Sequence, residues 1–326
     1  MQRNCMKYFI PVVVLLSLSF LSSIVTAQGL GSRLSEPLLW PAKVGIDEID
    51  FKVVKDDERA QKFVYQSKHF ELNTPFKLEP REVKQVMRVF EATHTAVRAM
   101  PFDFERRMPR DFTVRLYSNH TAYVEAGGYR FDNARYIADE KVLFLSPQIL
   151  DLKKSSAGHY NLGRIKTSEI IGEVTEQLLA GYEFPYWLKQ GIARYMELVP
   201  YHDGYFQFDQ LDVTAELKRK AKLLKEHGIM SEDGIAKSKV KDTGPAMKPA
   251  GKLTNTGFVW VAYIFQLSDP EVGERFKKFI QRTPGSWERG ANSYRILTDH
   301  SSDVGMDIRI DEALRAIGIE VFFYED

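Results

Sequence analysis

Apolar residues change their spacing several times along the chain, and each change marks an expected element. Short runs rich in aromatic and branched residues, at 63–65 and 69–72, predict two strands. After Pro80, apolar residues recur at steps of three and four up to Pro101, which predicts a helix with one buried face. His94 lies on that face, where a single histidine indicates a core residue rather than a ligand.

Strand-like runs continue through the first half of the chain. Residues 111–117 alternate in polarity and predict a half-buried strand, and residues 134–138 and 142–145 predict two more. Strands and one long helix ahead of a mainly helical C-terminal half indicate the α+β class, with a small mixed β-sheet packed on helices. Beyond residue 200 we expect helices at 214–227, 257–267, 272–280 and 310–317.

Residues 167–199 predict two helices joined by a short turn. The first helix carries its apolar residues on one face and collects a polar group on another, consisting of Glu169, Gly172, Glu173 and Glu176. Pro185 suits the first position of the second helix. The apolar stripe of that helix is Trp187, Leu188, Gly191, Ile192 and Tyr195. Its opposite side carries Gln190, Arg194 and Glu197.

The second helix reads PYWLKQGIARY over residues 185–195 and resembles a motif of the peptidase-MA-like gluzincins, which are zinc metallopeptidases. The matching scaffold residues are Pro185, Trp187, Leu188, Gly191, Ala193 and Tyr195. In that family, two histidines of an H-E-x-x-H helix and a glutamate on the next helix bind zinc, and the glutamate of the first motif activates the metal-bound water. The resemblance implies a zincin-like fold over most of residues 63–326, built around an active-site helix pair.

The zinc ligands of the family are replaced in this chain. Residues 172–176, GEVTE, fall where H-E-x-x-H would be, so Glu173 stands at the general-base position while Gly172 and Glu176 replace both histidines. Gln190 replaces the glutamate of the second helix. Glycine offers no side-chain ligand and glutamine is a weak neutral one, so we expect no zinc here and no other cofactor.

The polar face of the first helix has two further interpretations. It is either a solvated helix face or a residual hard-cation site of Glu169, Glu173 and Glu176, although hard cations require more oxygen ligands than these three residues supply. Gly172 is informative by itself, because a glycine inside a helix costs about 1 kcal/mol relative to alanine. Its presence indicates close packing at that point or a site that has lost its metal.

The N-terminus predicts a targeting segment. Arg3 and Lys7 precede an apolar run that ends in the small-residue pattern Val25-Thr26-Ala27, which favours a signal peptide over residues 1–27 and a secreted or periplasmic protein. The alternative is an uncleaved anchor helix, since roughly 17 to 25 apolar residues can span a bilayer. Cleavage would remove Cys5, the only cysteine, and with it disulfide bonds, thiol catalysis and cysteine metal ligands.

Beyond residue 27, the chain divides into three expected parts. Residues 28–60 read as a poorly packed N-terminal extension, residues 61–166 as an α/β sheet subdomain, and residues 167–326 as a helical subdomain that holds the degenerate motif. The basic, polar stretch 218–252 reads as a solvated connection within the last part.

Charge narrows the classes of function. Removal of residues 1–27, which hold two basic and no acidic residues, leaves 43 Lys and Arg against 44 Asp and Glu, a net charge of −1. A nearly neutral chain gives no support for nucleic-acid binding. Membrane contact is expected only if the N-terminal segment is retained.

Three functional hypotheses follow from these observations. The first is a secreted or periplasmic, catalytically inactive relative of zinc metallopeptidases, with a binding or structural role and a peptide, a protein or a cell-envelope polymer as partner. The second is an active peptide or glycan hydrolase that uses a non-zinc or divergent site around Glu173. The third is an envelope interaction protein whose contact region is the basic stretch 218–252.

Overall fold

The computed structural model gathers residues 37–326 into one compact unit. Within that unit it describes residues 38–154, 160–182, 184–231, 234–235, 251–268, 270–282 and 305–325. The expected targeting segment 1–27 and residues 236–250 of the basic stretch lie outside the described residues. Among the described helices, none combines the length and the apolar character needed to cross a membrane.

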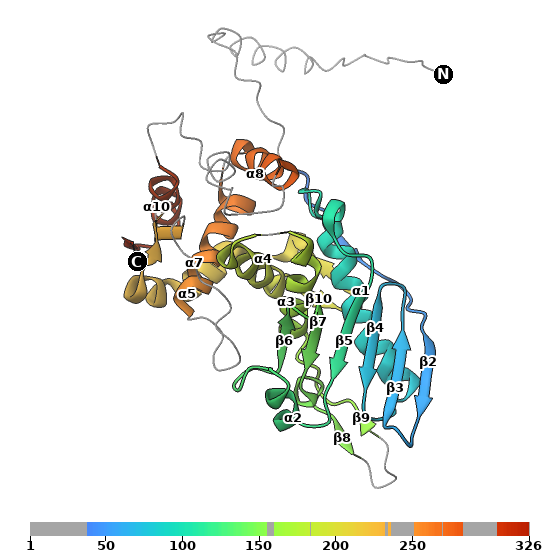
Figure 1. Cartoon of the computed structure of the whole chain (residues 1–326). Helices are drawn as coiled ribbons and strands as arrows, with labels where there is room; N and C mark the ends of the chain where they lie inside the picture. Colours follow the sequence, from blue (N-terminus) through green and yellow to red (C-terminus); the bar gives the residue numbers. More distant parts are fainter. Residues whose placement is uncertain are drawn as a thin grey trace, which may run out of the picture. The chain divides into compact units, whose positions relative to one another are not determined.

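A six-stranded mixed sheet is the centre of the first half (Figure 1). Its order is β2 (Lys52–Asp57), β3 (Lys62–Gln66), β4 (Phe70–Thr74), β5 (Phe112–Leu116), β7 (Val142–Leu145) and β6 (Ala134–Ile137). The three central strands β4, β5 and β7 run parallel, and the flanking strands pair antiparallel to their neighbours. The expected α+β class and mixed sheet are therefore confirmed. Strand β6 forms one edge of the sheet.

Helices cover the two faces of this sheet unequally. The long helix α1 (Pro80–Ala99) and helix α3 (Thr167–Leu178) contact one another and pack against one face. On the other face, the short helix α2 (His120–Glu125) covers β7 by packing Tyr123 against Val142 and Phe144. All four residues of β7 are therefore buried, whereas β4 and β5 alternate between buried and more exposed positions.

The remaining elements are mainly helical and belong to the same continuous core as the sheet. They include α4 (Tyr186–Leu198), α5 (Val213–His227), α7 (Gly251–Ala262) with a π-helical turn at Tyr263–Leu267, α8 (Pro270–Arg282) and α10 (Met306–Ala316). Helix α4 packs most extensively on α7 and next on α3. Two short strands, β12 (Ile229–Met230) and β13 (Phe323–Tyr324), are far apart along the chain and pair in parallel.

Residues 38–60, which the sequence suggested as part of a poorly packed extension, are mostly exposed and form two strands at the edges of sheets. They supply β1 (Lys43–Gly45), which pairs with β11 (Tyr205–Gln207), and the edge strand β2 of the main sheet. Trp40 lies with its ring centroid within 5.7 Å of those of Phe102, Tyr195, Phe208 and Phe265. The charged residues that made the stretch look solvated occupy the exposed edge strand, where their side chains reach water.

Candidate functional site

Helices α3 and α4 form the expected hairpin, and the motif residues of α4 fix its position. Pro185 lies at the N-cap, so the helix begins one residue later than the sequence suggested. Trp187, Leu188 and Tyr195 are fully buried, and the Trp187 ring centroid lies 5.9 Å from that of Trp260 on α7. The Tyr195 hydroxyl accepts a hydrogen bond of 2.7 Å from Gln266 Nε2. These residues, together with buried Ala193, are scaffold that holds α4 in the core.

Gly191 shows why a small residue is needed in this motif. A Cβ built at Gly191 would lie 2.3 Å from the carbonyl oxygen of Gly257, and a Cβ built at Gly257 would lie 2.1 Å from the carbonyl oxygen of Trp187. The backbones of α4 and α7 are therefore in direct contact at this pair of glycines.

Glu176 and Gln190 face each other across the two helices. Gln190 is only 3% exposed, and its Nε2 donates a hydrogen bond to Glu176 Oε1. These are the positions to which the resemblance assigns the second and third zinc ligands. The folding of the hairpin thus brings both positions together, but each side chain serves as the polar partner of the other.

At Gly172, to which the resemblance assigns the first zinc ligand, a different side chain fills the space. A Cβ added there would lie 2.2 Å from Oε1 of Glu197, a residue of α4 that forms an ion pair with Arg194. The glycine therefore makes room for the Glu197 carboxylate, which explains its presence inside a helix. A side-chain ligand at position 172 would have to displace Glu197.

Glu173 does not lie on a solvated helix face. It is 5% exposed, and its Oε2 accepts a hydrogen bond of 3.0 Å from the backbone N–H of Tyr136 on β6. Burial raises the pKa of the Tyr136 hydroxyl to about 12. Burial also raises the pKa of Tyr123, and the Glu173 carboxylate adds to that shift. The glutamate at the general-base position thus ties α3 to the edge of the sheet.

The three carboxylates of α3 have separate partners. Glu169 accepts a hydrogen bond of 2.9 Å from Asn133 Nδ2, while Glu173 and Glu176 bond to Tyr136 and Gln190. A hard cation would need these oxygens to converge on one point. The donor set at 172, 176 and 190 does not fit zinc either, since it offers no side chain at the first position and two side chains bonded to each other at the others.

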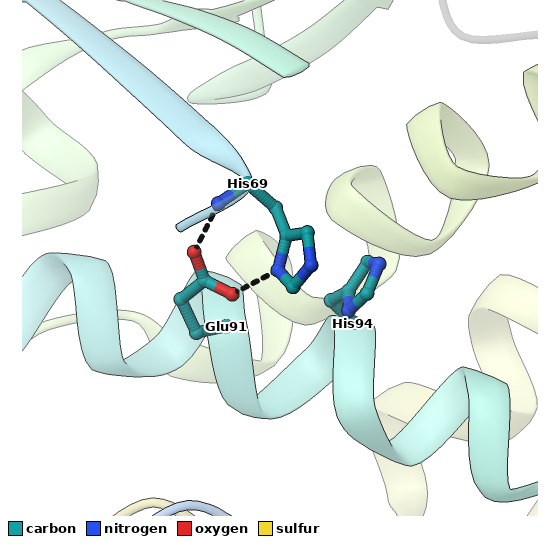
Figure 2. A group of neighbouring side chains, drawn as sticks. All are labelled: His69, Glu91 and His94. Atoms are coloured by element: carbon teal, nitrogen blue, oxygen red, sulfur yellow. Dashed lines mark hydrogen bonds and ion pairs between the residues drawn. The ribbon is translucent and has the colours of Figure 1, made fainter. Parts of the chain in front are cut away.

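A second polar cluster lies between α1 and the start of β4, and the sequence analysis did not predict it. His69, which directly precedes β4, meets Glu91 and His94 of α1, and the ligand atoms of all three lie within 4.8 Å of one another (Figure 2). Within the described part of the chain, this histidine cluster is the one group of three or more His, Cys, Asp or Glu residues with such spacing. Glu91 and His94 are buried, and the His69 side chain is 17% exposed.

The Glu91 carboxylate organises the histidine cluster. One of its oxygens accepts hydrogen bonds of 2.7 Å from Ser67 Oγ and from the backbone N–H of His69, and the other lies 2.6 Å from His69 Nδ1. The His94 ring stacks on the His69 ring with 3.9 Å between centroids. Burial, with a smaller contribution from the neighbouring His69, lowers the pKa of the His94 imidazole to about 4, although Glu91 opposes the shift. His94 is therefore neutral at pH 7.

His94 is buried, as predicted for a core residue. The sequence pattern, however, showed only two of the three members of the cluster. The pair Glu91 and His94, three residues apart, lies on one helix face and gives a local E-x-x-H pattern. His69 joins this pair through the parallel pairing of β4 with β5 and the packing of α1 on the sheet. That contact links residues 22 positions apart along the chain, beyond the reach of helix periodicity.

No protein-family model matches this chain, and no curated protein matches it. The resemblance of the helix pair to the gluzincins is therefore an expectation from the sequence.

Proposed function

We propose that the chain is a catalytically inactive, metallopeptidase-like protein of the cell exterior, in which the α3–α4 hairpin is retained as a scaffold for a binding or structural role. The hydrogen bond between Glu176 and Gln190 carries the proposal. It indicates that these two positions adjoin in space, as the resemblance requires of ligand positions, while the side chains present satisfy each other. The expected partner is a peptide, a protein or a cell-envelope polymer.

The environment of Glu173 supports the absence of hydrolysis. A general base must reach the proton of an attacking water at hydrogen-bond distance. Glu173 is buried, and its Oε2 already accepts the N–H of Tyr136, which competes with an attacking water for that oxygen. The zincin-like fold is part of the proposal and draws on the same geometry, together with the mixed sheet that α3 packs against.

The alternative of a carboxylate-pair hydrolase has less support. Such enzymes need two carboxyl groups on opposite sides of the bond that is cleaved. Glu173 and Glu176 are three residues apart on one helix and have different partners, Tyr136 and Gln190. No observation favours this mechanism over the inactive scaffold.

Peptide hydrolysis provides the direct test. The purified chain from residue 28 onward is incubated with a library of fluorogenic peptides, with added zinc and separately with a chelator. We expect no zinc-dependent cleavage. Cleavage that is lost both with the chelator and in Glu173→Gln would overturn the proposal.

Restoration of the ligand set tests the family assignment separately. The variant Gly172→His/Glu176→His/Gln190→Glu also carries Glu197→Ala, because the Glu197 carboxylate occupies the space beside position 172. We expect this variant to bind one more equivalent of zinc than Glu197→Ala alone, as measured by elemental analysis after gel filtration. A variant with native circular dichroism and no additional zinc would show that these positions are not arranged as in the peptidases.

A further inference from the structure

Structural hydrogen bonds explain only part of the histidine cluster. The hydrogen bonds of Glu91 to Ser67 and His69 attach the turn between β3 and β4 to α1. This structural role explains the burial of Glu91 and the position of His69 Nδ1. It does not account for His94, a buried imidazole stacked on another imidazole. Among the described residues, neither ring nitrogen of His94 has a hydrogen-bond partner.

The proton positions in the cluster follow from the donors present. A carboxylate only accepts hydrogen bonds, so the contact between Glu91 and His69 places a proton on His69 Nδ1. In neutral His69 the free lone pair is then on Nε2. Figure 2 shows Glu91 at one edge of the His69 ring and His94 beside that ring. A carboxylate that holds one nitrogen of a histidine while the other faces a ligand is the usual outer-shell arrangement at metal sites.

We propose that the histidine cluster binds one divalent transition-metal ion of the zinc type, with His69 Nε2 and a ring nitrogen of His94 as ligands and Glu91 as the residue that orients His69. Two imidazoles and a nearby carboxylate suit zinc, cobalt and nickel rather than calcium or magnesium, which take oxygen ligands. Because His69 is partly exposed, water can enter and complete the coordination. This site is separate from the α3–α4 hairpin and does not depend on its proposed function.

Ion binding requires a small rearrangement. Nitrogen ligands about 2.0 Å from a tetrahedral zinc ion are roughly 3.3 Å apart, with both lone pairs directed at the metal. The two rings are now stacked at 24° between planes, so they must turn about χ2, which is a broad torsion in histidine. Lys68 and Arg98 lie close enough to influence His94 electrostatically and oppose a cation, whereas Glu91 favours one.

Histidine NMR tests the site without relying on a variant that must fold. The full chain is freed of metal, and zinc chloride is added while long-range nitrogen–proton correlations of the seven histidine rings are recorded. We expect the signals of His69 and His94 to shift together and reach their end points at one equivalent, with His69 retaining a protonated Nδ1. Shifts confined to the other histidines, or no shift, would overturn the proposal.

Variants supply the second measurement. His94→Gln and His69→Gln should each lower the zinc affinity measured by calorimetry at least tenfold, while His227→Gln, at the exposed end of α5, should leave it unchanged. Equal affinity in His94→Gln and the wild type would contradict the assignment. Zinc bound at the α3–α4 hairpin would leave the signals of His69 and His94 in place, so the NMR result separates a failure of this inference from a failure of the proposed function.

Discussion

At the scale of single residues, polar side chains that the sequence presents as isolated prove to be paired across elements. Glu176 and Gln190 are the clearest pair, because Gln190 is almost fully buried. Removal of Glu176 would leave the buried amide without this acceptor, and an unsatisfied buried group costs about 1–3 kcal/mol.

We therefore expect Glu176→Ala and Gln190→Ala each to lower the free energy of unfolding, and the double variant to lose less than the sum of the two. The coupling should be about 1 kcal/mol, measured by urea denaturation. Glu169→Ala combined with Gln190→Ala is the control, since Glu169 bonds to Asn133 instead. In this control, the losses of the two single variants should add. If the losses also added for Glu176→Ala and Gln190→Ala, the two side chains would not stabilise each other.

His94 should make the stability of the metal-free protein depend on pH. Its pKa is about 4 in the folded chain and about 6.5 when unfolded, so between these values the unfolded chain binds a proton that the folded chain does not. The stability that His94 contributes is complete above about pH 6.5 and is lost as the pH falls towards 4. The groups that act electrostatically on the His94 imidazole are His69, Glu91, Arg98 and Lys68.

The measurement is urea denaturation at pH 7 and pH 4.5 in the presence of a chelator. The wild type should lose on the order of 2 kcal/mol more than His94→Gln between these values, because the variant differs from it only in lacking the imidazole of residue 94. A pH dependence that is the same in the two proteins would show that the folded state already accommodates a charged His94.

Residue-level chemistry was only partly predictable from the sequence. The wheel of the first helix correctly grouped Glu169, Gly172, Glu173 and Glu176 on one face, because helix geometry is local. What that face contacts depends on β6 and α4, so the burial of Glu173 and the approach of Glu197 to Gly172 could not be derived from periodicity. The histidine cluster could not be predicted for the same reason, since His69 lies at the start of β4 whereas its partners lie on α1.

At the scale of elements, the sequence was more informative. The expected helix pair at 167–199 corresponds to α3 and α4, and the strands expected at 63–65, 69–72, 111–117, 134–138 and 142–145 correspond to β3 to β7. Apolar periodicity and prolines fix such elements within a few residues. The sheet order and the packing of residues 38–60 depend on long-range pairing, for which a single sequence holds no periodic signal.

Two helical glycines offer an element-scale test of packing. Gly172 and Gly191 are both buried, but Gly172 faces the end of the Glu197 side chain whereas Gly191 faces the backbone of α7. A side chain can turn away and a backbone cannot. Gly191→Ala should therefore lower the free energy of unfolding by roughly 1–3 kcal/mol through overpacking. Gly172→Ala should stay within about 1 kcal/mol of the wild type, because the higher helix propensity of alanine offsets the displaced Glu197.

Thermal and urea unfolding of the two variants give the comparison directly. Each glycine serves as the control for the other, since both substitutions add one methyl group to a buried helix. Similar decreases in the free energy of unfolding for the two variants would mean that an added methyl group is tolerated between α4 and α7 as well as beside Glu197.

At the scale of the whole molecule, the apolar core runs without interruption from the sheet into the helices that follow it. Helix α1 contacts both β4 and α3, and Gln177 of α3 donates a hydrogen bond of 2.9 Å to the backbone of Thr113 on β5. The sheet and the helical part therefore share buried surface that either would expose if it unfolded alone. A unit held together in this way is expected to unfold in one cooperative step.

The positions of the tryptophans allow that expectation to be tested. All four lie outside residues 61–166, at positions 40, 187, 260 and 287. Tryptophan fluorescence therefore reports on parts of the chain other than the segment 61–166. Leu72 of β4 is fully buried, and Leu72→Ala should destabilise the protein by about 2–5 kcal/mol. If the core is one cooperative unit, the fluorescence midpoint in urea will fall together with the midpoint from far-ultraviolet circular dichroism. Leu188→Ala on α4 should shift both signals in the same way. A fluorescence transition that Leu72→Ala leaves in place would instead show that the sheet and the helices unfold as separate subdomains, divided near residue 166.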